Sequence, residues 1–229
     1  SLVFWGNRIE YGDWLAEPRT KNMFEWERIL VRRIVDQTFR AVYINEDYCN
    51  NSLLHTVKIF NNKFNSKYIL SILNSKLLAF YFVGKYARDE NTFPEIRVSE
   101  LKQLPIPEIP LSEQQPFIDK ADLMLSLNKE LQDKTDSFLR YISSKFWLEK
   151  LSTKLQKFYD YDFATFLKEL KWAKLSMSEE AELMEFFETK KSEIVSLKNR
   201  IDVTDSEIDE MVFELYGLSE EERRVVLDS

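Results

Sequence analysis

The sequence is poor in the residues from which most catalytic centres and cofactor loops are built. It holds four glycines, one cysteine and one histidine in 229 residues. Four scattered glycines cannot form a phosphate-binding loop, and neither a GxGxxG nor a P-loop sequence occurs. The single cysteine, Cys49, excludes an internal disulfide and a zinc cluster, and it favours a reducing, cytoplasmic setting. We therefore expect no catalytic site, cofactor or metal in this chain.

Long apolar runs are missing as well. No stretch approaches the length of a membrane span, and the N-terminus lacks the basic-then-apolar pattern of a signal peptide, so we expect no membrane partner. Apolar residues nevertheless make up 44% of the chain. That share is enough for one large domain or two modest domains with their own cores.

The net charge of −7 argues against a nucleic-acid partner until its distribution is considered. Residues 1–110 carry a net charge of +2, and residues 111–229 carry −9. Within residues 28–97 the balance is +5. The N-terminal half could therefore face a polyanion, whereas the C-terminal half could not do so broadly.

The N-terminal half predicts a small sheet followed by helix. Residues 27–48 are rich in β-branched and aromatic side chains that partly alternate, with a hairpin turn at 36–38, and residues 52–60 are a third strand candidate. Helical spacing over 66–83 predicts one helix, or two short helices broken near Asn74 and Ser75. Gly84 is expected to be a left-handed C-cap.

Four of the six prolines fall in residues 93–110, FPEIRVSELKQLPIPEIP. Because proline fixes φ and disfavours helix in the preceding residue, we expect a stiff, extended hinge, with one helical turn possible from Ser99. Helix is then predicted from 112 to about 148 and over 149–201, with breaks near 158–163 and 175–180. The predicted helix ends are capping boxes at Ser112/Gln115, Thr204/Glu207 and Ser219/Glu222, an N-cap at Ser178 and a C-cap at Gly217.

These patterns predict an α+β fold. Residues 1–110 would form a mixed α/β module with a small sheet, and residues 111–229, after the proline hinge, a long-helix bundle or helical arm that supports it. Isolated polar residues carry little weight: His55 is expected to be a core or surface histidine. A nuclease-like pattern of Asp162, Glu169 and Lys171 is too closely spaced and lies in helical sequence.

A binding surface is the functional feature that remains. Cations interleaved with tyrosine and phenylalanine suit duplex DNA, because they neutralise phosphates and because arginine can contact guanine through two hydrogen bonds. We expect the candidates to converge on one concave face; ordinary solvated charges would give the same pattern. The candidate DNA-binding residues are Arg28, Arg32, Arg33, Arg40, Lys76, Lys85, Tyr86, Arg88 and Arg97.

The order of four segments resembles the C-terminal specificity domain of TaqI-like adenine-specific DNA methyltransferases, which also occurs in fused type IIG restriction-modification enzymes. The segments are WERILVRRIVDQTFRAVYINEDY (26–48), LNSKLLAFYF (73–82), FPEIRVSELKQLPIP (93–107) and IDEMVFELYGLSEE (208–221). Each segment is weak evidence alone, and the order and spacing carry the resemblance.

The resemblance implies a target recognition domain that grips double-stranded DNA. A separate methyltransferase domain or subunit would bind S-adenosylmethionine and flip the adenine out of the duplex. The catalytic Asn-Pro-Pro-Tyr motif is absent, since no proline here follows an asparagine. Two alternatives stay open: half of a type I specificity subunit, which shares the LPIP entry into a long helix, and a helical interaction module that does not bind DNA.

Overall fold

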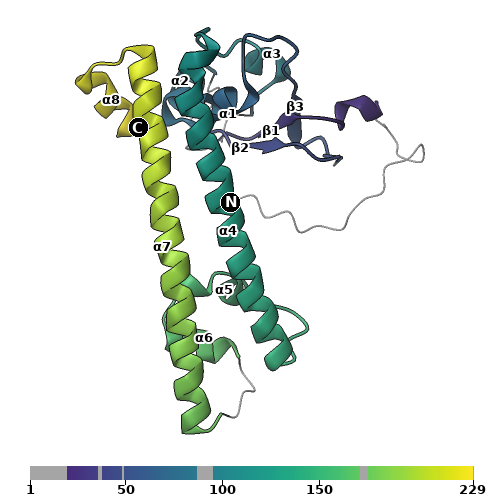
Figure 1. Ribbon diagram of the computed structural model, residues 1–229, viewed down its shortest axis with the longest axis vertical. Coiled ribbons are helices and arrows are strands. Elements are labelled where there is room, and N and C mark those ends of the chain that lie inside the picture. Colours follow the sequence, from purple (N-terminus) through teal and green to yellow (C-terminus); the bar gives the residue numbers. More distant parts are fainter. Residues whose placement is uncertain (1–19, 36–37, 48, 87–94, 171–174, 229) are drawn as a thin grey trace. The chain divides into compact units, whose positions relative to one another are not determined.

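The computed structural model shows the predicted α+β fold, with a small antiparallel sheet followed by long helices (Figure 1). It describes residues 20–35, 38–47, 49–86, 95–170 and 175–228, so Arg88 and Lys171 lie outside the described residues. The chain divides into two compact units. The first comprises residues 1–122 and 205–229, and the second comprises residues 123–204.

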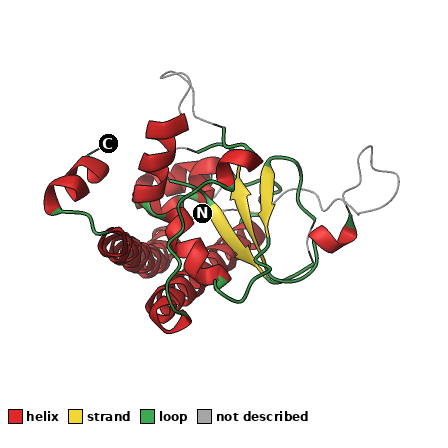
Figure 2. Ribbon diagram, turned by 90° about the horizontal axis from the view of Figure 1, so that it is seen from above, coloured by secondary structure: helices red, strands yellow, loops and turns green. Residues whose placement is uncertain are grey.

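The sheet of the first unit confirms the predicted hairpin and third strand. A short 3-10 helix, η1 (Lys21–Met23), precedes β1 (Arg28–Arg32), which pairs antiparallel with β2 (Ala41–Ile44) and β3 (Leu54–Val57), giving the order β2-β1-β3 (Figure 2). Leu30 lies opposite Val42 on one side and Thr56 on the other. Ile29, Leu30 and Val31 are buried, as expected of the central strand.

Two helices follow, and the break between them falls where the sequence predicted it. Helix α1 (Ser66–Asn74) ends at Ser75, which is extended, and α2 (Lys76–Tyr86) begins immediately afterwards. Asn74 fixes this junction to the sheet, because its side chain bonds both the N–H and the carbonyl of Ala41 (2.9 and 3.1 Å). The predicted C-cap at Gly84 is wrong: α2 continues past it to Tyr86, and Gly84 has no left-handed φ.

The last part of the proline segment is held by side-chain hydrogen bonds within the first unit. The segment contains the short helix α3 (Val98–Leu101), which starts one residue before the predicted Ser99. The Tyr68 hydroxyl donates to the carbonyl of Pro107 (2.8 Å), and the Tyr216 hydroxyl donates to that of Pro105. The amide of Gln114 donates to the carbonyl of Ile109 (2.9 Å). These bonds satisfy backbone carbonyls of an extended segment that does not belong to the sheet.

Two of the predicted capping boxes do not form. Helix α4 (Leu111–Lys145) starts before Ser112, directly after Pro110, so Ser112 lies inside the first turn. Helix α7 (Met177–Tyr216) runs straight through Thr204, whose hydroxyl donates to the carbonyl of Arg200 (2.8 Å). Thr204 lies in the interior of α7, where the backbone N–H groups are already bonded, so its hydroxyl bonds back to the preceding turn instead.

The N-terminus of α7 is also capped by a different serine from the predicted Ser178. Ser176 and Glu179 bond reciprocally: the Ser176 N–H donates to the Glu179 carboxylate (2.9 Å), and the Glu179 N–H donates to the Ser176 hydroxyl (3.3 Å). The C-terminal boundary is as predicted. Gly217 has φ of +69° and ends α7, and the Ser219/Glu222 capping box starts α8 (Glu220–Leu227).

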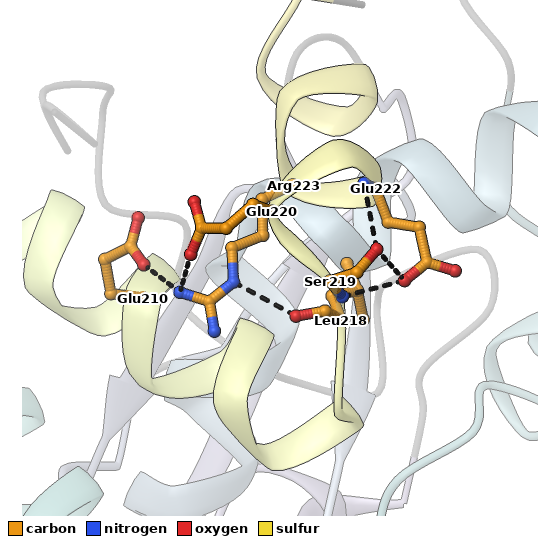
Figure 3. Close-up of polar contacts among 6 residues, drawn as sticks. All are labelled: Glu210, Leu218, Ser219, Glu220, Glu222 and Arg223. Carbon is orange, nitrogen blue, oxygen red and sulfur yellow. Dashed lines mark hydrogen bonds and ion pairs between the residues drawn. The ribbon is translucent and has the colours of Figure 1, made fainter.

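Helix α8 is held to the end of α7 by Arg223 (Figure 3). The guanidinium group of Arg223 contacts the Glu210 carboxylate at 2.7 Å and donates to the carbonyl of Leu218 at 3.2 Å. Val226 on the same helix is buried. Because α8 also packs on α2, the last residues of the chain belong to the same unit as the sheet.

The second unit is built around phenylalanine rings. Between its parts of α4 and α7 it contains α5 (Thr153–Gln156), η2 (Phe158–Asp160) and α6 (Phe163–Glu169). Phe138 stacks on Phe158 with ring centroids 3.9 Å apart, and Phe166 lies 4.7 Å from Phe187. Asp162 accepts the Thr165 N–H at 2.8 Å and serves as the N-cap of α6, which gives this member of the nuclease-like pattern a structural role.

Candidate nucleic-acid interface

Four of the predicted arginines, Arg32, Arg33, Arg40 and Arg97, belong to chain segments that meet at one end of the sheet, which we call the arginine end. Strand β1 ends at Arg32, whose N–H donates to the carbonyl of Arg40 just before β2 (3.0 Å). The carbonyl of the next residue, Arg33, accepts the N–H of Ile96 (2.8 Å), which brings Arg97 to the same end. The hairpin and the return of the chain at residues 95–97 therefore place the backbones of Arg32, Arg33, Arg40 and Arg97 at one end of the sheet, although Arg97 is far from the other three in sequence.

These four arginines differ in how their charge is compensated. Arg33 lies 2.5 Å from the Glu95 carboxylate and donates to the carbonyl of Ser52 (3.2 Å). Arg40 and Arg97 are exposed, and Arg32 is half-buried. Among the described residues, no ion pair involves Arg32 or Arg97. An uncompensated cation is the better phosphate ligand, because no internal pair must be broken when the polyanion arrives.

Arg28 lies at the other end of β1 and is fully buried. Its guanidinium group donates to the carbonyl of Trp26 (2.9 Å), and burial lowers its pKa. Trp26 has a left-handed φ of 68°, so this bond helps to hold an unfavourable backbone conformation. The side chain of Arg28 therefore supports the start of the sheet and does not extend the arginine end.

Lys76 starts α2 beside the same sheet end, but it faces a carboxylate. Its N–H donates to Asp209 of α7 (2.9 Å), and its ammonium group lies 3.8 Å from the second oxygen of Asp209. Burial raises the pKa of Asp209 to about 6. The Asp209 carboxylate thus partly compensates the charge of Lys76 within the first unit.

Lys85 and Tyr86 lie at the C-terminal end of α2 in a cluster with Tyr81, which the sequence reasoning did not single out. The Lys85 ammonium group donates to the Tyr81 hydroxyl (2.7 Å) and lies 5.1 and 5.2 Å from the ring centroids of Tyr81 and Tyr86. The Tyr86 hydroxyl donates to Gln103 (3.3 Å), just after α3. The spacing of four residues between Tyr81 and Lys85 on a helix was the signal that could have found this pair.

The side chains that could bind a metal ion do not cluster in the described part of the chain. No group of three histidine, cysteine, aspartate or glutamate side chains within residues 20–35, 38–47, 49–86, 95–170 and 175–228 could hold a metal ion. His55 lies 2.9 Å from the carbonyl of Ile96, and Cys49 is exposed. No helix in these ranges is both long enough and apolar enough to cross a membrane.

Comparison with known families confirms the resemblance for the N-terminal part of the chain. Residues 4–106 match the TaqI-like C-terminal specificity domain, and residues 110–212 match a domain of unknown function (DUF8810). No curated protein and no solved structure matches the chain. The specificity-domain match contains all nine candidate DNA-binding residues, and it supports DNA target recognition in a methyltransferase-type system.

Proposed function

We propose that this chain is the target recognition part of an adenine-specific DNA methyltransferase or type IIG restriction-modification enzyme. Residues at the arginine end of the sheet would contact double-stranded DNA. The catalytic centre, with its S-adenosylmethionine, would belong to a separate methyltransferase domain or subunit in the cytoplasm. This chain would supply sequence recognition and no reacting group.

The observation that carries the proposal is that backbone hydrogen bonds bring the main chains of Arg32, Arg33, Arg40 and Arg97 to one end of the sheet, inside the segment that matches a specificity domain. Arginines whose backbones lie at one end of a sheet would neutralise several phosphates at once where their side chains reach the same duplex. Each guanidinium group can also form two hydrogen bonds to the edge of a guanine, which discriminates against other bases by about 1–3 kcal/mol. Arg28 is left out of the proposed surface because it is buried.

The acidic residues of the chain support the same division of roles. Residues 111–229 carry a net charge of −9, and residues 28–97 carry +5. Duplex DNA would be repelled by the first region and attracted by the second, because exposed charges act over about a Debye length at moderate salt. The helices would therefore support the specificity domain or contact the methyltransferase part.

The test is binding of the full 229-residue chain to a pool of DNA duplexes with a randomised centre, at about 50 mM and about 200 mM salt. We expect salt-dependent binding and enrichment of a sequence motif. The double variant Arg32→Gln, Arg97→Gln should lose at least about tenfold in affinity and should change or lose the motif. Arg140→Gln, the same change at an exposed arginine of the second unit, is the matched control.

Three outcomes would count against the proposal. The chain could fail to bind duplex DNA at the lower salt concentration. The Arg32/Arg97 variant could bind as tightly as the control. The chain could form a stable oligomer that is indifferent to DNA, which would favour a helical interaction module.

A further inference from the structure

Lys85 differs from three other lysines of the first unit in what surrounds its charge. Lys63, Lys67 and Lys120 each lie within 2.7 Å of a carboxylate, from Glu108, Asp122 and Glu207 respectively. The described neighbours of the Lys85 ammonium group are the Tyr81 hydroxyl and two tyrosine rings. Ring faces and a phenol oxygen hold the ammonium group in place, and no carboxylate of the described residues pairs with it.

The hydrogen bonds within this cluster leave donors available. Tyr81 accepts the bond from Lys85 through its oxygen, so its own hydroxyl hydrogen is available to another acceptor. An ammonium group has three hydrogens, and one of them points at Tyr81. The Tyr86 hydroxyl is engaged with Gln103, which fixes its ring beside Lys85. The Lys85 Nζ atom and the Tyr81 hydroxyl oxygen therefore lie 2.7 Å apart at the exposed end of α2, and each carries a hydrogen that can be donated to another acceptor.

We propose that Tyr81, Lys85 and Tyr86 form a phosphate clamp, in which the Lys85 ammonium group and the Tyr81 hydroxyl donate to the oxygens of one DNA backbone phosphate. This inference rests on the proposed function, because it assigns a role within DNA binding. Tyr86 acts as a positioning residue: its ring and its bond to Gln103 keep Lys85 in place. The clamp fixes the register of the protein on the duplex, and the arginine end reads the bases.

A backbone phosphate is a better match than a base edge for chemical reasons. An ammonium group is a point charge without the planar fork through which arginine recognises guanine. Tyrosine hydroxyls are common phosphate donors in protein–DNA complexes. A purely structural role also exists, since a lysine in the last turn of a helix offsets the helix dipole. That role predicts lower stability of Lys85 variants with no change in the salt dependence of DNA binding.

The experiment compares the salt dependence of DNA binding for four variants of the full chain, using duplexes of at least three different sequences. Lys85→Gln should lower affinity about tenfold at low salt. It should also reduce the slope of log affinity against log salt concentration by about 0.9, the value for one released counterion. Lys85→Arg should restore the slope. Tyr81→Phe, which keeps the ring, should lower affinity about threefold without changing the slope, since no charge is removed. Lys129→Gln, at an exposed lysine of α4 in the second unit, should match the wild type.

The outcomes separate this inference from the proposed function. If Lys85→Gln keeps the wild-type slope while the Arg32/Arg97 variant loses binding, the clamp is wrong and target recognition stands. A Lys85→Gln effect that differs strongly between duplex sequences would also overturn the clamp, because a phosphate contact must act equally on all of them. If the chain binds no duplex at all, both proposals fail together.

Discussion

The carboxylate of Asp209 in α7 accepts the backbone N–H of Lys76, the first residue of α2, at 2.9 Å. A residue more than a hundred positions away thereby satisfies one of the N–H groups left without a partner at a helix start. The side chain of Asp209 is 6% exposed. Burial raises its pKa to about 6, against the opposing influence of Lys76. Helix α7 is therefore bound to helix α2 through a carboxyl group whose raised pKa lies in an accessible pH range.

Asp209 should make the stability of the chain depend on pH. A raised pKa means that the native state holds the proton more tightly than the unfolded state, so this contribution is greatest below about pH 4 and is lost as the pH rises towards about 6. Asp209→Asn keeps an oxygen acceptor for the Lys76 N–H without the buried charge. We expect its unfolding free energy, relative to the wild type, to increase from about pH 4 to about pH 7.5 by at most about 3 kcal/mol. Urea denaturation at the two pH values measures this difference, and a constant difference would contradict the prediction.

Removing the carboxylate of Glu95 should strengthen DNA binding. Glu95 lies 2.5 Å from Arg33, and both side chains are partly exposed. Glu95→Gln would release Arg33 and remove a negative charge from the arginine end, so we expect affinity for duplex DNA to rise about threefold at low salt. Fluorescence anisotropy with a labelled duplex is the measurement. Glu108→Gln breaks the comparable ion pair with Lys63 and serves as the control, for which we expect a smaller gain. Equal gains would mean that only net charge matters.

Gln114 is a buried polar side chain that bonds the end of the proline segment. It is fully buried, its oxygen accepts the Asn65 N–H (2.9 Å), and its amide donates to the carbonyls of Lys63 (2.6 Å) and Ile109 (2.9 Å). Gln114→Ala leaves three buried backbone groups without this partner and creates a cavity. We expect a loss of about 3 kcal/mol in unfolding free energy. The neighbouring exposed Gln115, changed to alanine, should alter stability by less than about 0.5 kcal/mol. Similar effects at both positions in a urea titration would show that the buried bonds contribute little.

Gln114 also shows why some sequence predictions succeeded and others did not. The Ser219/Glu222 box and the Gly217 C-cap were predicted correctly because they depend on residues within a few positions of one another. The capping box expected at Ser112 competes with Pro110, which allows α4 to begin earlier, and with the long-range bonds of Gln114. Local patterns cannot show that a residue is already engaged by a distant backbone group.

In the candidate interface, too, local sequence patterns predicted some features, whereas others depend on tertiary packing. Hydrophobic alternation in the sequence predicts the strands that carry the basic residues. The predicted hairpin between these strands then places Arg32, Arg33 and Arg40 near one another. The burial of Arg28 and the pairing of Lys76 with Asp209 depend on tertiary packing that no spacing in the sequence reveals. Tyr81 was missed although it lies four residues before Lys85 on the same helix, because the hydrogen bond between them is seen only in the structure.

Trp147 provides a prediction for the second unit. It follows α4 with a left-handed φ of 52° and is 90% exposed. The N–H of Leu148 donates to the carbonyl of Ser143 (3.0 Å), which is the bond of a helix end that normally carries glycine. A side chain with a Cβ costs about 1–2 kcal/mol in this conformation, and the exposed indole recovers little of it. Trp147→Gly should therefore raise the free energy of unfolding by about 1 kcal/mol in urea denaturation. Trp147→Ala is the matched control, since alanine removes the indole but keeps the Cβ, and it should show no gain. If the glycine variant is less stable than the wild type, the indole must form contacts that outweigh the backbone strain.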